Sequence, residues 1–562
     1  MAAVGAESQS HSDIGKPFSY FNLREIYLQL MLKILVSDKL AQEGLDFLQH
    51  QDDVELTVKT GLKEDELAGI IGQYDGLVIR SGTQVTAKVL EKAVRLKAIA
   101  RAGVGVDNID IPAATARGVV VMNTPDGNTI SAAEHTIAIM MALSRHVIAG
   151  CNSLKAGKWE RKLFMGTQLM GKTLAVIGLG RIGMAVARRA MCMKMKVIGY
   201  DPLADPEDAN QAGVKLYDDI DDLCRDCDYL TLHVPVTDKT RGLINAQRIA
   251  LMKPTARIIN VARGAVINTQ DLYDALRQKK IAGAALDVFT EEPPKNRDFE
   301  TLDNCIVTPH LGASTSEAQV EVAVDAVKEL LDALRGLQMR NALNVPGLDK
   351  TLPENVNHYR MLAERLGLLI SSITPGKIKG IQVTYRGEIA QQDTGAVTTA
   401  FCVGLLQHHF EEPVNMVNAP VLARQRNISI DETKNPDLQD FASTMEAKLI
   451  TDKAERTVTG TVIGKGLPRI IGIDDYALEM TPEGAIMIIF NDDRPGVIGA
   501  VGTICGKHKL NIGTMGVGRF KDQNRAVLAI DLDELPNEEA VAEFQQQDFV
   551  KNVYVCQLSV NK

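Results

Sequence analysis

The chain has 562 residues, 45% of them hydrophobic and 24% charged, with a formal net charge of -9. This length exceeds what one core supports and predicts three or four domains. The acidic balance and the single Trp argue against a nucleic-acid-binding surface, which needs a broad basic face. No stretch approaches the ~20 apolar residues of a membrane span, so we expect no membrane partner.

The eight cysteines show no framework, and Cys224 and Cys227 form a lone C-x-x-C pair. Zinc or redox chemistry at this pair is the minor alternative. We expect no metal site and place both residues on a helix that precedes a strand. Scattered reduced thiols are typical of a cytoplasmic protein, which is the location we expect.

Residues 1–32 lack a signal-like apolar region and are predicted to be an N-terminal extension, although Met31 is an alternative start. From Lys33 to residue 130, short Val- and Ile-rich runs alternate with helical patterns. This alternation predicts a parallel sheet covered on both faces.

A second series of the same kind begins at Thr173 and ends near "NCIVTPH". The fold class is therefore α/β, with two doubly wound, Rossmann-like domains and a ligand site between them. The helix that starts at Ser316 follows the second series, so we expect the chain to cross back to the first. The predicted units are a split domain (33–130 and 309–345) and a nucleotide-binding domain (131–308).

Two further units follow a linker rich in Pro, Gly and Asn. Residues 346–480 are predicted to form an α+β domain. Residues 481–562 have the pattern of a small β-α-β module, and modules of this size usually regulate or assemble the protein that carries them.

The stretch "LAVIGLGRIG" ends a predicted strand and opens a helix with Gly178, Gly180 and Gly183 in G-x-G-x-x-G spacing. The glycines permit a tight turn, close approach of a pyrophosphate, and close helix–strand packing. Asp201 ends the next strand, where a carboxylate accepts bonds from ribose hydroxyls and repels a 2′-phosphate. The sequence therefore predicts that the chain binds NAD.

Arg263, Glu292 and His310 each follow a strand of the nucleotide-binding unit, at the sheet edge where an α/β active site lies. Hydride removal from an alcohol needs a base for the hydroxyl proton, and histidine titrates near physiological pH. A carboxylate on the far nitrogen fixes the tautomer, and an arginine clamps a carboxylate on the substrate. These residues are our candidate catalytic set.

The order GLGRIG, YDP, NVARG, ALDVFTEEP and PHLGAS resembles that of the D-isomer-specific 2-hydroxyacid dehydrogenases. The resemblance implies that Arg263 binds substrate, Glu292 pairs with His310, and His310 is the acid/base. It also implies the residues that contact NAD: Gly178, Gly180, Arg181, Ile182, Gly183, Asp201, Val234, Val261, Ala262, Arg263, Asp287, His310, Gly312 and Ala313.

The stretches "RAGVGVDNID" and "GKWERK" are similar to those of family members with a phosphorylated substrate. They indicate oxidation of 3-phospho-D-glycerate (3-phosphoglycerate) to 3-phosphooxypyruvate, the first step toward L-serine. The expected substrate contacts are Arg80, Arg101, Gly103, Arg161 and Lys162. An ordinary solvated surface is the alternative for the "KWERK" segment.

The stretch "NDDRPGVIGAVGTICGKHKLNIGTM" resembles a ferredoxin-like ACT domain, and residues 354–480 resemble the intervening domain of the longest family members. The resemblance implies L-serine as a possible effector at Asn491, Asp493 and Asn511. It also implies a homo-oligomer, a dimer or a tetramer. Two rivals stay open: a glyoxylate or hydroxypyruvate reductase, and an NAD-sensing corepressor of the same fold.

Overall fold

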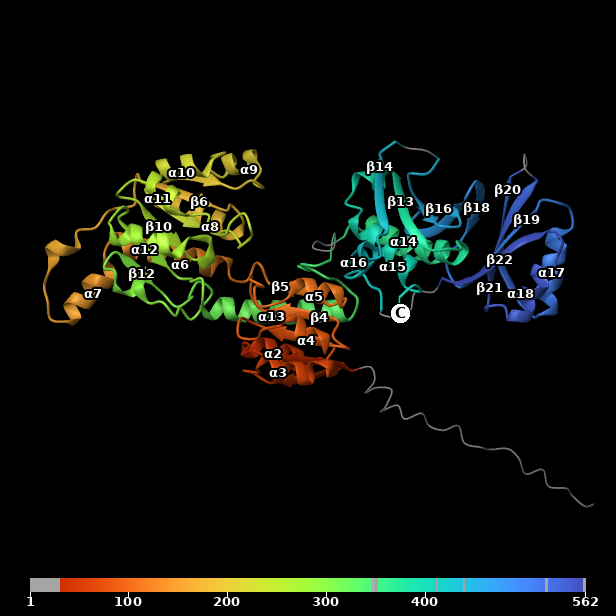
Figure 1. Ribbon diagram of the computed structural model, residues 1–562, viewed down its shortest axis with the longest axis horizontal. Helices are drawn as coiled ribbons and strands as arrows, with labels where there is room; N and C mark the ends of the chain where they lie inside the picture. Colours follow the sequence, from red (N-terminus) through yellow and green to blue (C-terminus); the bar gives the residue numbers. More distant parts are fainter. Residues whose placement is uncertain are drawn as a thin grey trace, which may run out of the picture.

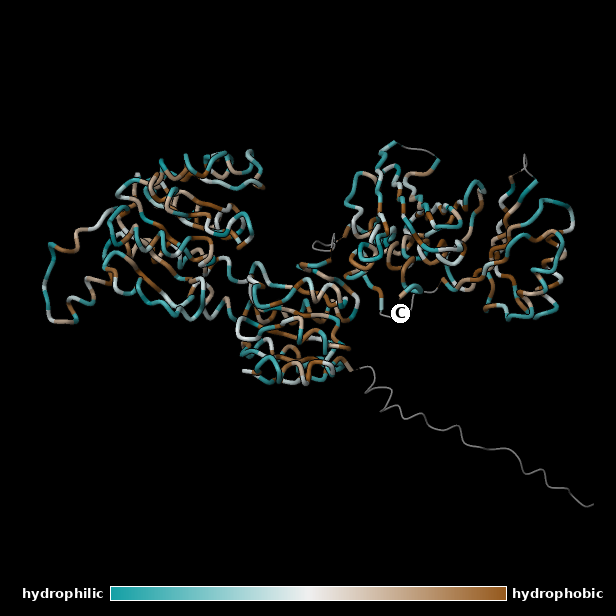
Figure 2. The backbone as a smooth tube through the Cα atoms, viewed as in Figure 1, coloured by the Kyte–Doolittle hydropathy of each residue, from teal (hydrophilic) through white to brown (hydrophobic). Residues whose placement is uncertain are grey.

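The computed structural model describes residues 31–345, 347, 352–410, 413–437, 440–520 and 524–558. Apart from its last two residues, the expected N-terminal extension lies outside them. Four sheets follow one another along the molecule, each with its own helices (Figure 1). Hydrophobic segments run through the interior of all four units (Figure 2).

The first unit, which we call the substrate unit, contains a parallel five-stranded sheet in the order β2-β1-β3-β4-β5. Helix α13 (Ser316–Leu334) packs on one face of this sheet, so the predicted return of the chain is confirmed. Its strands are β1 (Leu32–Val36), β2 (Val54–Val58), β3 (Gly76–Ile79), β4 (Ala98–Arg101) and β5 (Val120–Asn123), and its other helices are α2 (Gln42–Gln49), α3 (Glu64–Ile70), η1 (Ile71–Gln73), α4 (Ala87–Glu91) and α5 (Ile111–Ala116).

The nucleotide unit contains a parallel seven-stranded sheet in the order β12-β11-β10-β9-β6-β7-β8. The order reverses between β6 and β9, and ligands bind at such a switch point in open α/β sheets. Its strands are β6 (Thr173–Ile177), β7 (Lys196–Tyr200), β8 (Lys215–Leu216), β9 (Tyr229–Leu232), β10 (Arg257–Asn260), β11 (Gly283–Leu286) and β12 (Cys305–Val307), and its helices are α6 (Thr129–Ser144), α8 (Arg181–Cys192), α9 (Pro206–Gln211), α10 (Ile220–Asp226), α11 (Ala246–Leu251), η3 (Gly264–Val266), α12 (Thr269–Arg277) and η4 (Asp298–Thr301).

Between α6 and β6 the chain forms a projecting arm, residues 146–170, with α7 (Val147–Lys155) and η2 (Arg161–Phe164) (Figure 1). Within the described residues, no single helix has the length and apolar character of a membrane span. The helices α6 and α7, which meet at 62°, together have the length and composition of a membrane span. However, α6 packs in the core of the nucleotide unit.

The intervening unit is a mixed six-stranded sheet in the order β14-β13-β15-β16-β17-β18, packed against α14 and α15. Every residue of α15 except Gly395 is buried, because small and apolar residues occupy all sides of this helix. The elements are α14 (Glu354–Ile373), β13 (Ile378–Gly387), η5 (Glu388–Gln391), α15 (Gly395–Leu406), α16 (Ala419–Gln425), β14 (Ser429–Asn435), β15 (Ser443–Thr451), β16 (Glu455–Ile463), β17 (Leu467–Ile473) and β18 (Tyr476–Met480).

The C-terminal unit has the β-α-β-β-α-β order and an antiparallel sheet, β20-β21-β19-β22, so the ferredoxin-like prediction is confirmed. One face of this sheet packs on α17 and α18, and the other joins the core of the intervening unit. The elements are β19 (Ala485–Asp492), α17 (Val497–Lys507), β20 (Ile512–Phe520), β21 (Arg525–Leu532), α18 (Glu538–Gln545) and β22 (Val550–Gln557). The exact domain boundaries stay predictions.

A short segment that we call the docking loop, residues 413–418, joins the intervening unit to the substrate unit. Val417 is 2% exposed and packs in the core formed by α13 and the first sheet. The side-chain amide of Asn415 donates to the carbonyl of Gly118 at 2.9 Å. Gly118 has φ +70°, and a Cβ there would lie 2.6 Å from Asn415 Nδ2, so this contact favours glycine.

Candidate active site

His310 and Glu292 lie on the loops that follow β12 and β11, and their side chains meet. His310 Nδ1 and Glu292 Oε2 are 2.6 Å apart, and the backbone N–H of Phe289 donates to Glu292 Oε1 at 3.0 Å. Burial would raise the pKa of Glu292, but the bonds from His310 and Phe289 outweigh it and hold that pKa below its usual range. Glu292 is thus an anion that accepts from Nδ1–H and leaves Nε2 of His310 as a base.

The loop that carries His310 is anchored by Asp287, which is fully buried. Its carboxylate accepts from the backbone N–H groups of Leu311 and Gly312 at 2.7 and 2.8 Å, and from the Thr308 hydroxyl at 2.6 Å. These bonds, with one from His135, outweigh desolvation and lower the pKa of Asp287. Asp287 therefore fixes the backbone on either side of the candidate base.

Arg263 follows β10, and the buried Asn260 sets the conformation of its backbone. Asn260 accepts from the N–H of Ala262 at 3.0 Å and donates to the carbonyl of Arg263 at 2.9 Å. The Arg263 guanidinium donates from Nη1 to the carbonyl of Ala262 at 2.7 Å and from Nε to Asp107 at 3.1 Å. Asp107 belongs to the substrate unit, so this contact crosses from one unit to the other.

Arg101 and Arg80 stand on the substrate unit close enough to Arg263 for their charges to interact. Burial, followed by the charges of Arg263 and Arg80, lowers the pKa of Arg101 to about 10. Within the described residues its buried Nε has no hydrogen-bond partner. Gly103 has φ +142°, and a Cβ there would lie 2.1 Å from Arg101 Nη1. Three cations and an unsatisfied donor are groups that suit an anion.

The glycine turn after β6 has the shape that a dinucleotide needs. Gly178 has φ +90°, and a Cβ on Gly183 would lie 1.9 Å from the carbonyl oxygen of Gly178. A Cβ on Gly180 would meet open space within 4 Å beyond its own chain neighbours, which leaves room for a pyrophosphate at the N-terminus of α8. Asp201 accepts from the N–H of Leu179 at 2.9 Å, so its carboxylate lies beside the turn. The turn therefore fits NAD.

The remaining expected NAD contacts cluster around this turn and the His310 loop. A Cβ on Gly178 would lie 2.8 Å from Val234, and one on Gly312 would lie 2.8 Å from Val261. Arg181 forms an ion pair with Asp126 at 2.6 Å, Ile182 packs at the edge of the core, and the carbonyl of Ala313 accepts from Gln319. Their roles toward the cofactor stay predictions.

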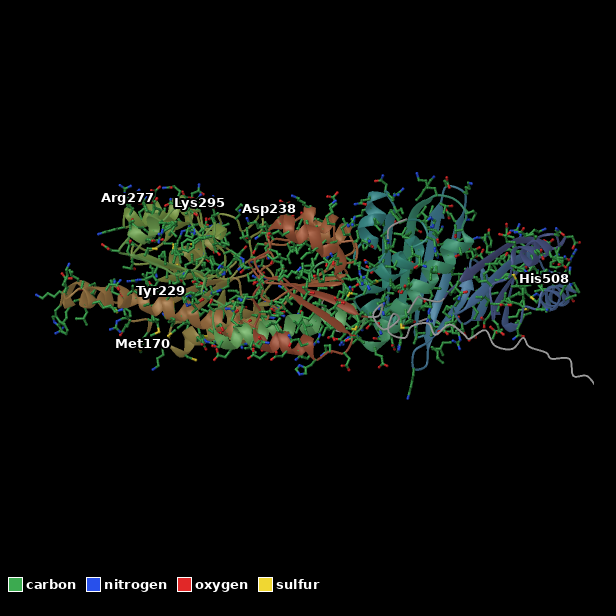
Figure 3. All side chains as sticks on the ribbon, turned by 90° about the horizontal axis from the view of Figure 1, so that it is seen from below. Met170, Tyr229, Asp238, Arg277, Lys295 and His508 are labelled. Carbon is green, nitrogen blue, oxygen red and sulfur yellow. The ribbon has the colours of Figure 1, made fainter. Side chains whose placement is uncertain are left out.

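Two groups of predicted residues lie apart from this cluster. Arg161 and Lys162 are exposed on η2 of the arm. The expected effector residues lie in the C-terminal unit, where Asp493 pairs with Arg519 and Asn511 donates to Asp533, each at 2.8 Å. Figure 3 shows how far apart the units are: Lys295, on the Glu292 loop of the nucleotide unit, and His508, directly after α17 of the C-terminal unit, lie toward opposite ends of the molecule.

Cys224 lies on α10 as expected, whereas Cys227 immediately follows the helix in extended conformation, so its predicted helical placement is wrong; both thiols are buried. Burial raises the pKa of Cys224 to about 12, which makes it a poor metal ligand or nucleophile. In the part of the chain that the structure describes, no group of three or more His, Cys, Asp or Glu side chains is arranged to hold a metal ion.

Asp107 and Asn260 were missed by sequence reasoning. Asp107 lies within the "RAGVGVDNID" stretch, but its partner Arg263 is 156 residues away. Asn260 directly precedes "VARG", and a buried amide at the end of a strand is the signal that could have identified it.

A switch-point glycine turn, a His–Glu pair and an arginine cluster define an NAD-dependent dehydrogenase of 2-hydroxy acids. Residues 137–312 match the family model "D-isomer specific 2-hydroxyacid dehydrogenase, NAD binding domain". A solved protein of Thermus thermophilus, TT0316, superposes with a TM-score of 0.52 at 34% identity over 56% of this chain and 100% of its own. D-lactate dehydrogenase from Aquifex aeolicus, solved with NAD and lactic acid, gives 0.50 at 29% identity over 54% and 96%.

Full-length relatives narrow this class. The chain is 42% identical to D-3-phosphoglycerate dehydrogenase of Synechocystis sp. over 94% of this chain and 95% of the relative, and 42% identical to that of Methanocaldococcus jannaschii over 94% and 100%. Residues 355–474 match the D-3-phosphoglycerate dehydrogenase intervening domain, and residues 485–549 match the ACT domain. The chain belongs to the D-3-phosphoglycerate dehydrogenase family.

Proposed function

We propose that this chain oxidises 3-phospho-D-glycerate to 3-phosphooxypyruvate with NAD, as the first step of L-serine biosynthesis. The observation that carries the proposal is the arginine cluster beside the His310–Glu292 pair. A phosphate and a carboxylate on a three-carbon substrate need more than one cation, whereas an unphosphorylated 2-hydroxy acid needs a single clamp. The names of the relatives favour the same substrate.

In this reaction Nε2 of His310 accepts the proton of the substrate hydroxyl. Glu292, held as an anion, stabilises the imidazolium through Nδ1–H. NAD, when bound at the glycine turn, supplies the acceptor for the hydride from the substrate's C2. Arg263 holds the carboxylate of the substrate and polarises the developing carbonyl, while Arg80 and Arg101 face its phosphate.

We also propose that the chain works as a homodimer or larger oligomer through the arm. Large apolar side chains on the arm are exposed, and such patches mark interaction surfaces. They are Val147 54%, Ile148 44%, Leu154 58%, Trp159 76%, Leu163 68% and Met165 84% exposed. Leu163 also lines a cavity of about 1740 Å³ that reaches Glu292 and His310. An arm that packs on a partner would bring Arg161 and Lys162 toward a partner's substrate.

L-serine is the proposed effector of the ACT domain, with Asp493 taking its ammonium group and Asn491 and Asn511 its polar groups. Gly496, at φ +94°, directly precedes α17 as its N-cap residue, and the first N–H groups of that helix suit a carboxylate. Asp493 is held by Arg519, so a bound ammonium would share that carboxylate with a guanidinium.

The test is steady-state NADH formation with 3-phospho-D-glycerate, with and without L-serine, and with D-glycerate as the control. We expect turnover that requires the phosphate and falls as serine is added. Equal rates on D-glycerate would contradict the substrate and favour a glyoxylate or hydroxypyruvate reductase. Phosphate-dependent turnover that ignores serine would contradict the effector alone.

A further inference from the structure

The contact between Arg263 and Asp107 is the ion pair that links the two units inside the candidate active site. Arg263 follows a strand of the nucleotide sheet, and Asp107 lies on the loop after β4 of the substrate sheet. Nε of Arg263 and Oδ2 of Asp107 are 3.1 Å apart, although the residues are 156 positions apart in sequence. Asp107 is therefore placed to orient the arginine that we propose binds the substrate.

Stability does not explain this carboxylate. The side chain of Asp107 is 69% exposed and that of Arg263 is 29% exposed. Exposed ion pairs contribute little to folding, because water and salt screen them and side-chain entropy opposes them. The ion pair with Arg263 therefore adds little to the free energy of unfolding.

The hydrogen bonds of the guanidinium show what the contact does. Nε is held by Asp107 and Nη1 by the carbonyl of Ala262, which fixes the plane of the group from two sides. Within the described residues, Nη2 donates to no protein acceptor and lies against Gly105, where a Cβ would come within 1.8 Å of it. The free Nη2 of Arg263 thus lies at the loop that follows Arg101, the last residue of β4, and that carries Gly103 and Gly105.

Asp107 also offsets part of the positive charge. Its charge raises the pKa of Arg101, against the lowering by Arg263 and Arg80. Without the Asp107 carboxylate, the three positively charged guanidinium groups would repel one another more strongly. The long Arg263 side chain would then be free to turn away from Arg101.

We propose that Asp107 is a positioning residue. From the substrate unit it holds Arg263 of the nucleotide unit, so that the free Nη2 of Arg263 meets the carboxylate of the substrate. This inference rests on the proposed role of Arg263 in the proposed function. It assigns Asp107 no contact with the reacting atoms.

The experiment compares kcat and KM of the full chain with those of Asp107→Ala and Asp107→Asn. The matched control is Asp65→Ala, which removes an exposed carboxylate paired with Lys88 elsewhere on the same unit. We expect Asp107→Ala to lower kcat/KM for 3-phospho-D-glycerate by about tenfold or more, with KM for NAD and the unfolding temperature near those of the control. Asp107→Asn retains an acceptor for Nε–H but not the negative charge, and should recover part of that loss.

Values for Asp107→Ala equal to those of Asp65→Ala would overturn the proposal, as would an Asp107→Asn variant as impaired as Asp107→Ala. A change in KM for NAD equal to that for the acid would show a general disturbance instead. If the unmutated chain does not oxidise 3-phospho-D-glycerate, the proposed function fails. The same variants are then compared on the 2-hydroxy acid that it does oxidise.

Discussion

Two glutamates, one exposed and one buried, show how environment sets the charge of a single residue. Glu292 receives hydrogen bonds on both oxygens and stays ionised. Glu329, on α13, is 7% exposed, and its Oε1 accepts from Asn341 at 2.6 Å, whereas its buried Oε2 has no partner among the described residues. Burial raises the pKa of Glu329 to about 7, and the nearby charge of Asp325 adds to this effect.

Glu329→Gln should therefore change how stability depends on pH. Because the folded pKa is raised from 4.5 to about 7, the native chain favours the protonated acid. The stability this provides is fully present below about pH 4.5 and is lost as the pH rises to about 7. We expect the variant to match the unmutated chain in stability at pH 4 and to exceed it by up to about 3 kcal/mol at pH 8, measured by thermal unfolding.

Glu321→Gln is the matched control, because Glu321 lies exposed on the same helix. It should show the pH dependence of the unmutated chain. A Glu329→Gln variant with that same pH dependence would mean that Glu329 is ionised in the folded protein at neutral pH.

At the residue scale, sequence reasoning predicted the groups that lie on one sheet edge. His310 and Glu292 follow adjacent strands of the parallel sheet, so the rule that places strand ends together was sufficient to pair them. The same rule was silent on Arg263 and Asp107, because that contact depends on how two separately folded units meet. Local patterns carry no information on such a pairing.

At the scale of elements, most strands of the two Rossmann-like units were predictable because buried parallel strands are short Val- and Ile-rich runs. The two-residue strand β8 was not, since so short an edge strand has no pattern of its own. The docking loop was also missed, because its sequence "PVNMVN" has no periodicity. Its conformation depends on side-chain amides: Asn415 Oδ1 accepts from the N–H groups of Val417 and Asn418 at 2.9 and 3.2 Å.

Asn415→Asp tests whether the docking loop joins the two units. The carboxylate still accepts from Val417 and Asn418, but it loses the amide donor and faces the carbonyl of Gly118. A buried carbonyl left without its donor costs about 1–3 kcal/mol. Hydrogen exchange of the backbone in β5 should therefore become about tenfold faster or more.

Asn427→Asp makes the same chemical change at an exposed position beyond α16 and is expected to leave the exchange of β5 unchanged. Equal exchange in the two variants would show that the contact with Gly118 does not hold the units together.

At the scale of the whole molecule, the sequence predicted four units in the correct order but not the surfaces by which they meet. The arm shows why: "GKWERK" is consistent with both a solvated surface and an interface. The structure adds a run of exposed apolar side chains, which favours an interface.

Replacement of Leu163 and Met165 by Ser should lower the oligomeric state, because it removes apolar area from the proposed contact. Light scattering at fixed concentration measures the result, which we expect to be a halved mass. Val94→Ser is the control, since Val94 is 75% exposed but lies on the substrate unit. A double variant with the mass of the unmutated chain would place the contact elsewhere.

The docking loop has a mechanical consequence. Val417 is packed in the core of the substrate unit, while the core of the intervening unit continues into the C-terminal sheet. The substrate, intervening and C-terminal units are thus expected to move as one body, which would rotate where the chain passes to the nucleotide unit. A small rotation of this body that brings the substrate unit closer to the nucleotide unit would displace its far end, near His508 in Figure 3, over a much longer distance. Restraint of that distant end would equally resist rotation between the substrate unit and the nucleotide unit.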